Sequence, residues 1–169
     1  ETTLKPAAHL TCVDASREET MQIVDEYAQA GVREIVALRG DAPQGQAVWT
    51  AHPEGFASSV ELIEAIAKRG DIAIRVGAYP EPHPDSPGAA ADVAFLKRKV
   101  DAGATSAITQ FFFDADTFFR FRDASVADVK AVGAKWLGVG DHTLVVEPGE
   151  RVALAELPSG KPAPFNVPA

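Results

Sequence analysis

A repeating order of strand, polar residues, helix and glycine runs along most of the chain and limits the folds it can adopt. Apolar runs predict four strands, over 9–14, 34–38, 72–78 and 106–113. Each repeat has roughly the 30-residue size of a βαβ unit. The strands lack a regular alternation of apolar and polar residues, which is typical of parallel strands that helices cover on both faces. The sequence therefore predicts an α/β fold.

Helix signals separate these strands. Ser16, with Glu19 three residues later, is typical of a capping box, and the helix that it begins is expected to end at Gly31. Apolar residues at helical spacing predict two further helices, over 56–68 and 89–102. Prolines at 80, 82, 84 and 87 instead favour an extended, stiff loop after the third strand.

The stretch 95–114, FLKRKVDAGATSAITQFFFD, combines the end of a helix with the fourth strand. Three basic residues, 97–99, lie near the helix C-terminus, where positive charge suits the dipole, and Gly103 provides a stop. The apolar run 107–113 is expected to be buried. Gln110 interrupts it, and a buried glutamine needs partners, which a ligand can supply.

Two architectures fit the repeat: an open doubly wound sheet, or part of a (β/α)8 barrel. In both, ligands bind at the carboxyl ends of the strands. Polar residues gather at these predicted ends: Asp14, Arg39, Asp41, Tyr79, Glu81, His83, Gln110 and Asp114.

The repeat stops after residue 123, so we expect a (β/α) segment over 1–123 and an unassigned segment over 124–169. Within the second segment the sequence indicates a short helix over 126–132 and a strand over 136–139. It further indicates a hairpin of 143–147 with 151–156 across Pro148 and Gly149, followed by a proline-rich tail.

Composition narrows the function. The net charge of −8 argues against a nucleic-acid partner, which needs clustered Lys and Arg. The single cysteine, Cys12, allows no intrachain disulfide and favours a reducing compartment such as the cytoplasm. No apolar run is long enough to span a membrane, and the four histidines lack metal-site spacing. GxGxxG, Walker A and GxSxG motifs are also absent from the sequence.

Two of the predicted strand ends allow both a structural and a functional interpretation. Arg39-Gly40-Asp41 is either a tight surface turn, or a site where Gly40 lets the backbone approach a ligand while Arg39 holds an anion. Tyr79 either packs at the rim or stacks on a planar ring, and His83 is either solvent-exposed or a ligand contact.

The helix over 89–102 allows the same choice. Asp92 either complements the helix N-terminus or shares a ligand with Lys99, seven residues later on the same stripe. Arg98 and Lys99 are by default solvated charges at the helix end, and Phe111 to Phe113 are by default core.

Five motifs in a fixed order resemble the methylenetetrahydrofolate reductase family, a family of FAD-dependent enzymes of one-carbon metabolism. They are HLTC (9–12), LRGD (38–41), AYPE with a nearby His (78–83), D-x-x-x-L-K-R-K-V-D-A-G (92–103) and ITQFFFD (108–114). The resemblance implies a (β/α)8 barrel that binds FAD at the carboxyl ends of its strands. It also implies reduction of 5,10-methylenetetrahydrofolate to 5-methyltetrahydrofolate by NADH or NADPH through the flavin, an activity tied to methionine biosynthesis.

The same resemblance assigns roles residue by residue. Asp41 resembles the acid near the flavin ring and the bound folate, and Gln110 resembles the glutamine that contacts folate and nicotinamide in turn. The residues that resemble FAD contacts are His9, Arg39, Gly40, Asp41, Tyr79, His83, Asp92, Arg98 and Lys99.

The chain also departs from the family pattern. The family's general-acid glutamate lies in the first strand, whereas the motifs here correspond to about strands three to six. Phe95 occupies a position where the family can have a polar flavin contact, and the loop after Asp41 is short. Residue 1 is Glu and the only methionine is Met21, so we expect a processed chain or a fragment.

The expectation is therefore a truncated or divergent member of the family that takes a folate substrate. An open barrel edge would favour self-association. The alternatives are a barrel remnant or flavin-binding module without the general acid, and an unrelated (β/α) enzyme that acts on an anionic metabolite.

Overall fold

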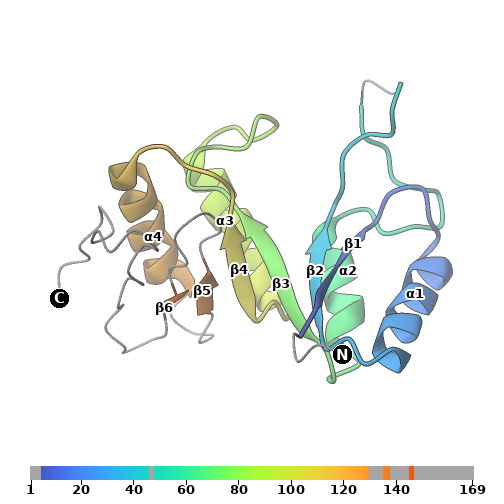
Figure 1. Ribbon diagram of the computed structural model, residues 1–169. Coiled ribbons are helices and arrows are strands. Elements are labelled where there is room, and N and C mark those ends of the chain that lie inside the picture. Colours follow the sequence, from blue (N-terminus) through green and yellow to red (C-terminus); the bar gives the residue numbers. More distant parts are fainter. Residues whose placement is uncertain (1–4, 46–47, 130–134, 138–144, 147–169) are drawn as a thin grey trace, which may run out of the picture. The chain divides into compact units, whose positions relative to one another are not determined.

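A computed structural model describes residues 5–45, 48–129, 135–137 and 145–146. Strands and helices alternate along most of this length (Figure 1). The elements are β1 (Ala7–Thr11), α1 (Arg17–Gln29), β2 (Glu34–Leu38), α2 (Ser59–Ala67), β3 (Ala73–Ala78), α3 (Ala89–Asp101), β4 (Ser106–Thr109), α4 (Ala115–Val129), β5 (Lys135–Leu137) and β6 (Val145–Val146). The four predicted strand–helix repeats are confirmed.

The strands follow one another in chain order, β1-β2-β3-β4-β5-β6. β1 with β2, β2 with β3, and β4 with β5 pair in parallel, while β6 runs antiparallel to β5. Ile35 of β2 lies opposite Ala8 on one side and Ile74 on the other. A doubly wound sheet reverses its strand order at a switch point, and this order shows no reversal, so the fold is consistent with part of a (β/α)8 barrel.

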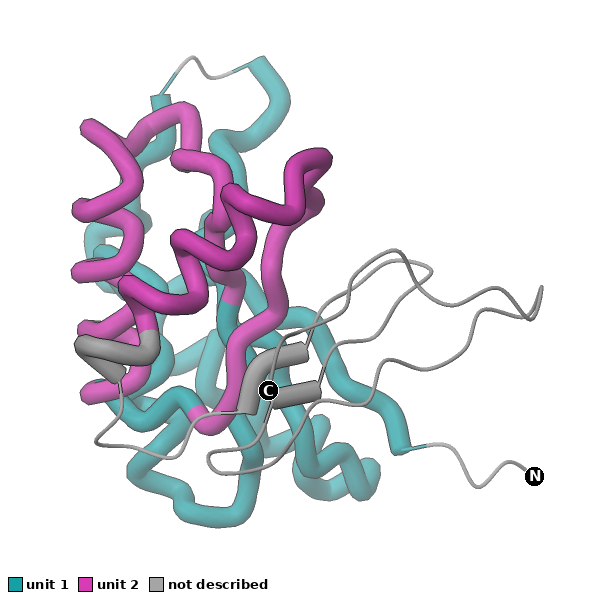
Figure 2. Tube along the Cα trace, turned by 90° about the vertical axis from the view of Figure 1, so that its left-hand side faces the viewer, with its two compact units in different colours: residues 1–76, 102–104 teal, residues 77–101, 105–169 magenta. Residues whose placement is uncertain are grey.

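The chain divides into two compact units, which Figure 2 colours separately. Unit 1 comprises residues 1–76 and 102–104, and unit 2 comprises residues 77–101 and 105–169. In unit 1, helices α1 and α2 bury apolar side chains with β2 and β3, among them Val24, Ile35, Leu62, Ile66 and Ile74. In unit 2, α3, β4 and α4 contribute Val93, Leu96, Val100, Ala107, Phe118 and Phe121. Each unit therefore has apolar side chains of its own to bury.

Local signals account for the helix ends. The Ser16 side chain accepts a hydrogen bond from the Glu19 N–H, and the Glu19 carboxylate accepts one from the Ser16 N–H (2.9 Å), which is the predicted capping box. The second helix begins three residues later than predicted, at Ser59, because Ser58 caps it. Phe56 lies outside that helix but is buried.

The fourth strand is shorter than predicted, ending at Thr109 rather than 113. Phe111 and Phe113 are consequently exposed by 66% and 94%, so the expectation that they belong to the core is wrong. The ring of Phe112, by contrast, stacks on that of Phe118, with 4.9 Å between the ring centroids.

Beyond residue 123 the description is partial. Helix α4 runs from Ala115 to Val129 and so includes the first part of the helix predicted over 126–132, and β5 (Lys135–Leu137) overlaps the strand predicted over 136–139. The expected hairpin partner over 151–156 and the proline-rich tail lie outside the described residues. The expected boundary at residue 123 stays a prediction.

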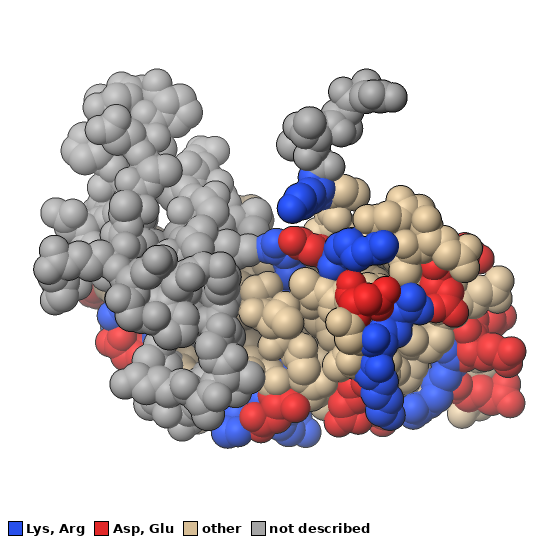
Figure 3. Space-filling view, turned by 90° about the horizontal axis from the view of Figure 1, so that it is seen from below, with Lys and Arg blue, Asp and Glu red and all other residues tan. Residues whose placement is uncertain are grey.

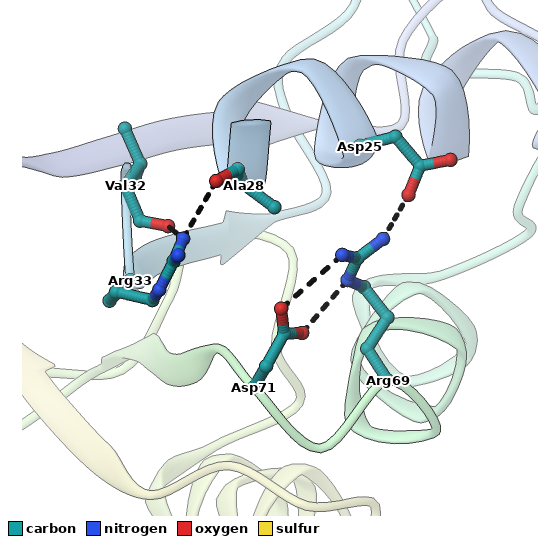
Figure 4. Close-up of polar contacts among 6 residues, drawn as sticks. All are labelled: Asp25, Ala28, Val32, Arg33, Arg69 and Asp71. Atoms are coloured by element: carbon teal, nitrogen blue, oxygen red, sulfur yellow. Dashed lines mark hydrogen bonds and ion pairs between the residues drawn. The ribbon is translucent and has the colours of Figure 1, made fainter. Parts of the chain in front are cut away.

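Charged side chains of unit 1 are paired around the ends of α1 and α2 (Figure 4). Arg69 donates to Asp71 (2.9 Å) and to Asp25, and Arg33 donates to the Ala28 carbonyl (2.8 Å). The Arg69 guanidinium holds the pKa of Asp71 below its usual range. These paired charges therefore stabilise the fold around α1 and α2.

One face of the molecule, drawn in Figure 3, carries Lys and Arg beside Asp and Glu rather than a patch of one sign. No helix among the described residues has the length and apolar character that crossing a membrane requires.

Candidate functional site

In unit 1, the chain turns sharply at Gly40 directly after β2. Gly40 has a φ of +83°, a conformation that side chains disfavour. A Cβ at this position would lie 2.4 Å from Val13 Cγ2 and 3.0 Å from Thr11 Cβ. The turn after β2 therefore passes against the segment after β1 so closely that only glycine fits.

Two hydrogen bonds join the residues before Gly40 to Cys12, which follows β1. The Cys12 N–H donates to the Arg39 carbonyl (3.3 Å), and the Cys12 thiol donates to the Leu38 carbonyl (3.4 Å). Burial raises the pKa of the Cys12 thiol, which stays a neutral donor. The Arg39 side chain is half-buried, with its guanidinium 5.4 Å from the centre of the Trp49 ring and its Nε donating to the Gly40 carbonyl (3.2 Å).

The other two predicted residues of unit 1 are exposed. His9 lies on β1 opposite Val36, and Asp41 follows Gly40 directly. Unit 1 thus presents a histidine in the middle of β1, and an arginine and an acid just beyond the end of the neighbouring parallel strand β2.

In unit 2, Lys99 is a charged residue whose side chain lies in the interior. It is only 6% exposed, so the default expectation of a solvated helix-end lysine is wrong. Its Nζ donates to the Gly77 carbonyl (2.8 Å) and lies 4.8 Å from the centre of the Phe95 ring and 5.9 Å from that of Tyr79. Burial lowers the pKa of Lys99 to about 8, and the charge of Asp92 opposes this shift. Burying an ammonium group costs free energy, and strongly perturbed pKa values of this kind are frequent at functional sites.

Tyr79, His83 and Asp92 gather near Lys99. The Asp92 carboxylate accepts the His83 N–H (3.1 Å), which fastens the proline-rich loop to α3. The Tyr79 and His83 rings meet edge to face at 4.8 Å. His83 is half-buried, not fully exposed, and its Nδ1 accepts the Asp85 N–H (3.0 Å).

Gln110 lies just past the end of β4. Its N–H donates to the Ala78 carbonyl (2.7 Å) and its Oε1 accepts the Phe111 N–H (3.2 Å). Because β4 ends at Thr109, the Gln110 side chain is exposed and not buried as the strand prediction implied. Its carboxamide oxygen faces its own chain, so the amide nitrogen is the atom suited to donate to a ligand.

The structure thus brings four predicted residues together in unit 2, namely Tyr79, His83, Asp92 and Lys99, and three beside one another in unit 1, at 39–41. Sequence reasoning missed the role of Phe95, whose half-buried ring contacts both Arg98 and Lys99. Its spacing of three and four residues from these cations on a helix was the available signal. Among the described residues, no three His, Cys, Asp or Glu are grouped as metal ligands.

The burial of Lys99 predicts how stability depends on pH. The pKa is about 8 in the folded chain and about 10.4 in an unfolded one. Between these values the unfolded state binds more protons, so the free energy of unfolding rises with pH. From about pH 8 to 10 we expect Lys99 to contribute a rise on the order of 1–3 kcal/mol, which Lys99→Met removes.

Urea denaturation of the unchanged protein and of Lys99→Met, each at about pH 8 and about pH 10, measures this contribution. Lys97→Met is the matched control, because it removes the same charge from an exposed position of the same helix. An identical pH dependence in the unchanged chain and in Lys99→Met would show that the ammonium is not buried.

Comparisons with known proteins identify the family. The sequence model of the family described as "Methylenetetrahydrofolate reductase" matches residues 1–134. The 5,10-methylenetetrahydrofolate reductases of Pectobacterium carotovorum and Escherichia coli K12 are each 49% identical over 126 residues, which cover 75% of this chain and 40% of each relative. The "Methylenetetrahydrofolate reductase (NADH) 1" of Zea mays is 40% identical over 136 residues, covering 74% of this chain and 22% of that relative.

Among solved structures, this chain is similar to a crystal structure of dihydropteroate synthetase, with a TM-score of 0.45 and 16% sequence identity. The match covers 78% of this chain and 43% of the synthetase chain. The chain spans 40% of the length of the bacterial relatives it matches. With a family match over residues 1–134, the chain belongs to the methylenetetrahydrofolate reductase family.

Proposed function

We propose that the chain supplies the flavin-binding part of a methylenetetrahydrofolate reductase, which reduces 5,10-methylenetetrahydrofolate to 5-methyltetrahydrofolate with NADH or NADPH. Family membership supports the reaction class. The observation that carries the proposal is the buried Lys99 ammonium beside exposed Arg98, a pair of cations suited to an anionic cofactor.

The described residues fit FAD. Arg98 and Lys99 would hold its diphosphate, since charged donors bind phosphate oxygens strongly. The edge-to-face rings of Tyr79 and His83 provide aromatic surface for a planar group. Gly40, where a Cβ would meet Val13, keeps the turn after β2 in place and so fixes the backbone of Arg39 and Asp41 on either side of it. When bound, FAD would supply the hydride chemistry between nicotinamide and folate, while the protein supplies position and charge.

Asp41 and Gln110 are the residues that we propose act on the substrates. Asp41 would place a negative charge beside the flavin and the folate. Gln110 would donate from its amide nitrogen to folate and nicotinamide in turn, its oxygen being held by the Phe111 N–H. His9, Arg39 and Asp92 complete the proposed cofactor contacts, Asp92 chiefly by fastening the His83 loop.

The proposal includes a place in one-carbon metabolism and methionine biosynthesis, a cytoplasmic location and self-association. A second candidate function is flavin binding without folate reduction. It is favoured by one observation: Lys99, whose burial carries the proposal, is assigned to the diphosphate of FAD and not to the folate.

Anaerobic mixing tests both candidates. The protein is loaded with FAD and mixed with NADH or NADPH, and the visible flavin absorption is followed. We expect the absorption to bleach and to return when 5,10-methylenetetrahydrofolate is added. Bleaching without return would support the second candidate, and no bleaching with either nucleotide would contradict the reductase proposal.

A further inference from the structure

Two neighbouring cations of α3 converge on one aromatic ring. The Phe95 ring centre lies 4.7 Å from Arg98 Cζ and 4.8 Å from Lys99 Nζ. Phe95 is half-buried, Arg98 is exposed and Lys99 is buried, so the ring contacts one exposed and one buried cation.

Arg98 and Lys99 differ from the neighbouring Lys97 in whether they form an ion pair with a carboxylate. Lys97 forms an ion pair with Asp101 at 2.6 Å, four residues later. Among the described residues, neither Arg98 nor Lys99 forms an ion pair with a carboxylate within the 4.0 Å limit that defines one. The negative charge of Asp92 raises the pKa of Lys99, but the Asp92 carboxylate forms its hydrogen bond with the His83 N–H and not with Lys99. The two cations therefore keep positive charge for a ligand.

An aromatic ring can hold two neighbouring cations such as Arg98 and Lys99 in position. Two like charges on long side chains repel each other and lose rotamer freedom when a ligand fixes them. The negative face of a phenyl ring attracts both cations without cancelling their charge, as a carboxylate would. The Gly77 carbonyl further fixes Lys99.

We propose that Phe95 is a positioning residue that holds Arg98 and Lys99 in place for the diphosphate of FAD. The inference rests on the proposed function. It gives a role to the position where this chain departs from the family's polar contact: the ring preorganises two cations and need not touch the cofactor itself.

The test compares Phe95→Leu, which keeps an apolar side chain but removes the ring, with Phe95→Tyr, which keeps the ring. Dissociation constants of FAD and of riboflavin, which lacks the diphosphate, are measured by flavin fluorescence at several salt concentrations. We expect Phe95→Leu to weaken FAD about three- to tenfold and to reduce the salt dependence of FAD binding, with riboflavin unchanged. Phe95→Tyr should restore FAD binding.

Phe119→Leu is the matched control, because the Phe119 ring also lies under an arginine, with Arg122 Cζ at 5.0 Å, but on α4. It should leave both dissociation constants unchanged. If Phe95→Leu weakened the binding of FAD and riboflavin equally, or weakened neither, this inference would be overturned and the proposed function would stand. Failure of the unchanged chain to bind FAD would overturn the proposed function and this inference with it.

Discussion

Replacing Gly40 by Ala is expected to destabilise unit 1 and to weaken FAD binding about tenfold or more, which corresponds to at least ~1.4 kcal/mol. The new Cβ would lie 2.4 Å from Val13 Cγ2, so the turn after β2 must move away from the segment after β1. Overpacking of this kind costs about 1–3 kcal/mol, and a side chain at φ +83° costs about 1–3 kcal/mol more. The displaced turn would shift Arg39 and Asp41 together.

Gly31→Ala separates the two causes. Gly31 has a similar φ of +88°, but a Cβ there meets nothing within 4 Å. It should show only the conformational cost and keep its affinity for FAD. Urea denaturation and FAD titration of both variants make the comparison. Equal destabilisation by the two substitutions would mean that the close approach at Gly40 is not a constraint.

Changing Asp41 to Asn is expected to lower the rate of folate reduction by roughly 100-fold, the scale seen when one charged or hydrogen-bonding group is lost from an active site. The substitution keeps the shape of the side chain and removes its charge. Because Asp41 is exposed, stability should change little. FAD should stay bound, since the cations that we assign to the diphosphate lie elsewhere in the chain.

Stopped-flow measurements with FAD-loaded protein separate flavin reduction by NADH from flavin reoxidation by 5,10-methylenetetrahydrofolate. We expect the folate half-reaction to lose the larger share of its rate. Glu18→Gln, the same chemical change at an exposed position of α1, is the control and should behave like the unchanged protein. An unchanged folate rate in Asp41→Asn would exclude the proposed role.

The sequence predicted those parts of the fold that local chemistry determines. β2 was predicted at its observed bounds, and the capping box of Ser16 and Glu19 formed as expected. Gly31 adopts the positive φ that a helix stop uses. Such features depend on a few neighbouring residues, so a pattern along the chain is enough to find them.

Features that depend on tertiary contacts could not be predicted in this way. The apolar run to Phe113 gave no sign that β4 ends at Thr109, because hydrophobicity does not distinguish a strand from an exposed aromatic loop. Lys99 looked like a helix-end charge, yet it is buried and its Nζ donates to the carbonyl of Gly77, which lies 22 residues earlier in the chain. Its depth follows from how the helix packs, not from its neighbours in sequence.

The most direct test of the account is a titration of the purified chain with FAD, followed by the visible absorption spectrum and flavin fluorescence after unbound cofactor is removed. We predict saturable binding with a perturbed flavin spectrum, and weaker binding at high salt, because cations hold the diphosphate. A protein that stays colourless and leaves the spectrum of free FAD unchanged would contradict the claim that these residues form a flavin site.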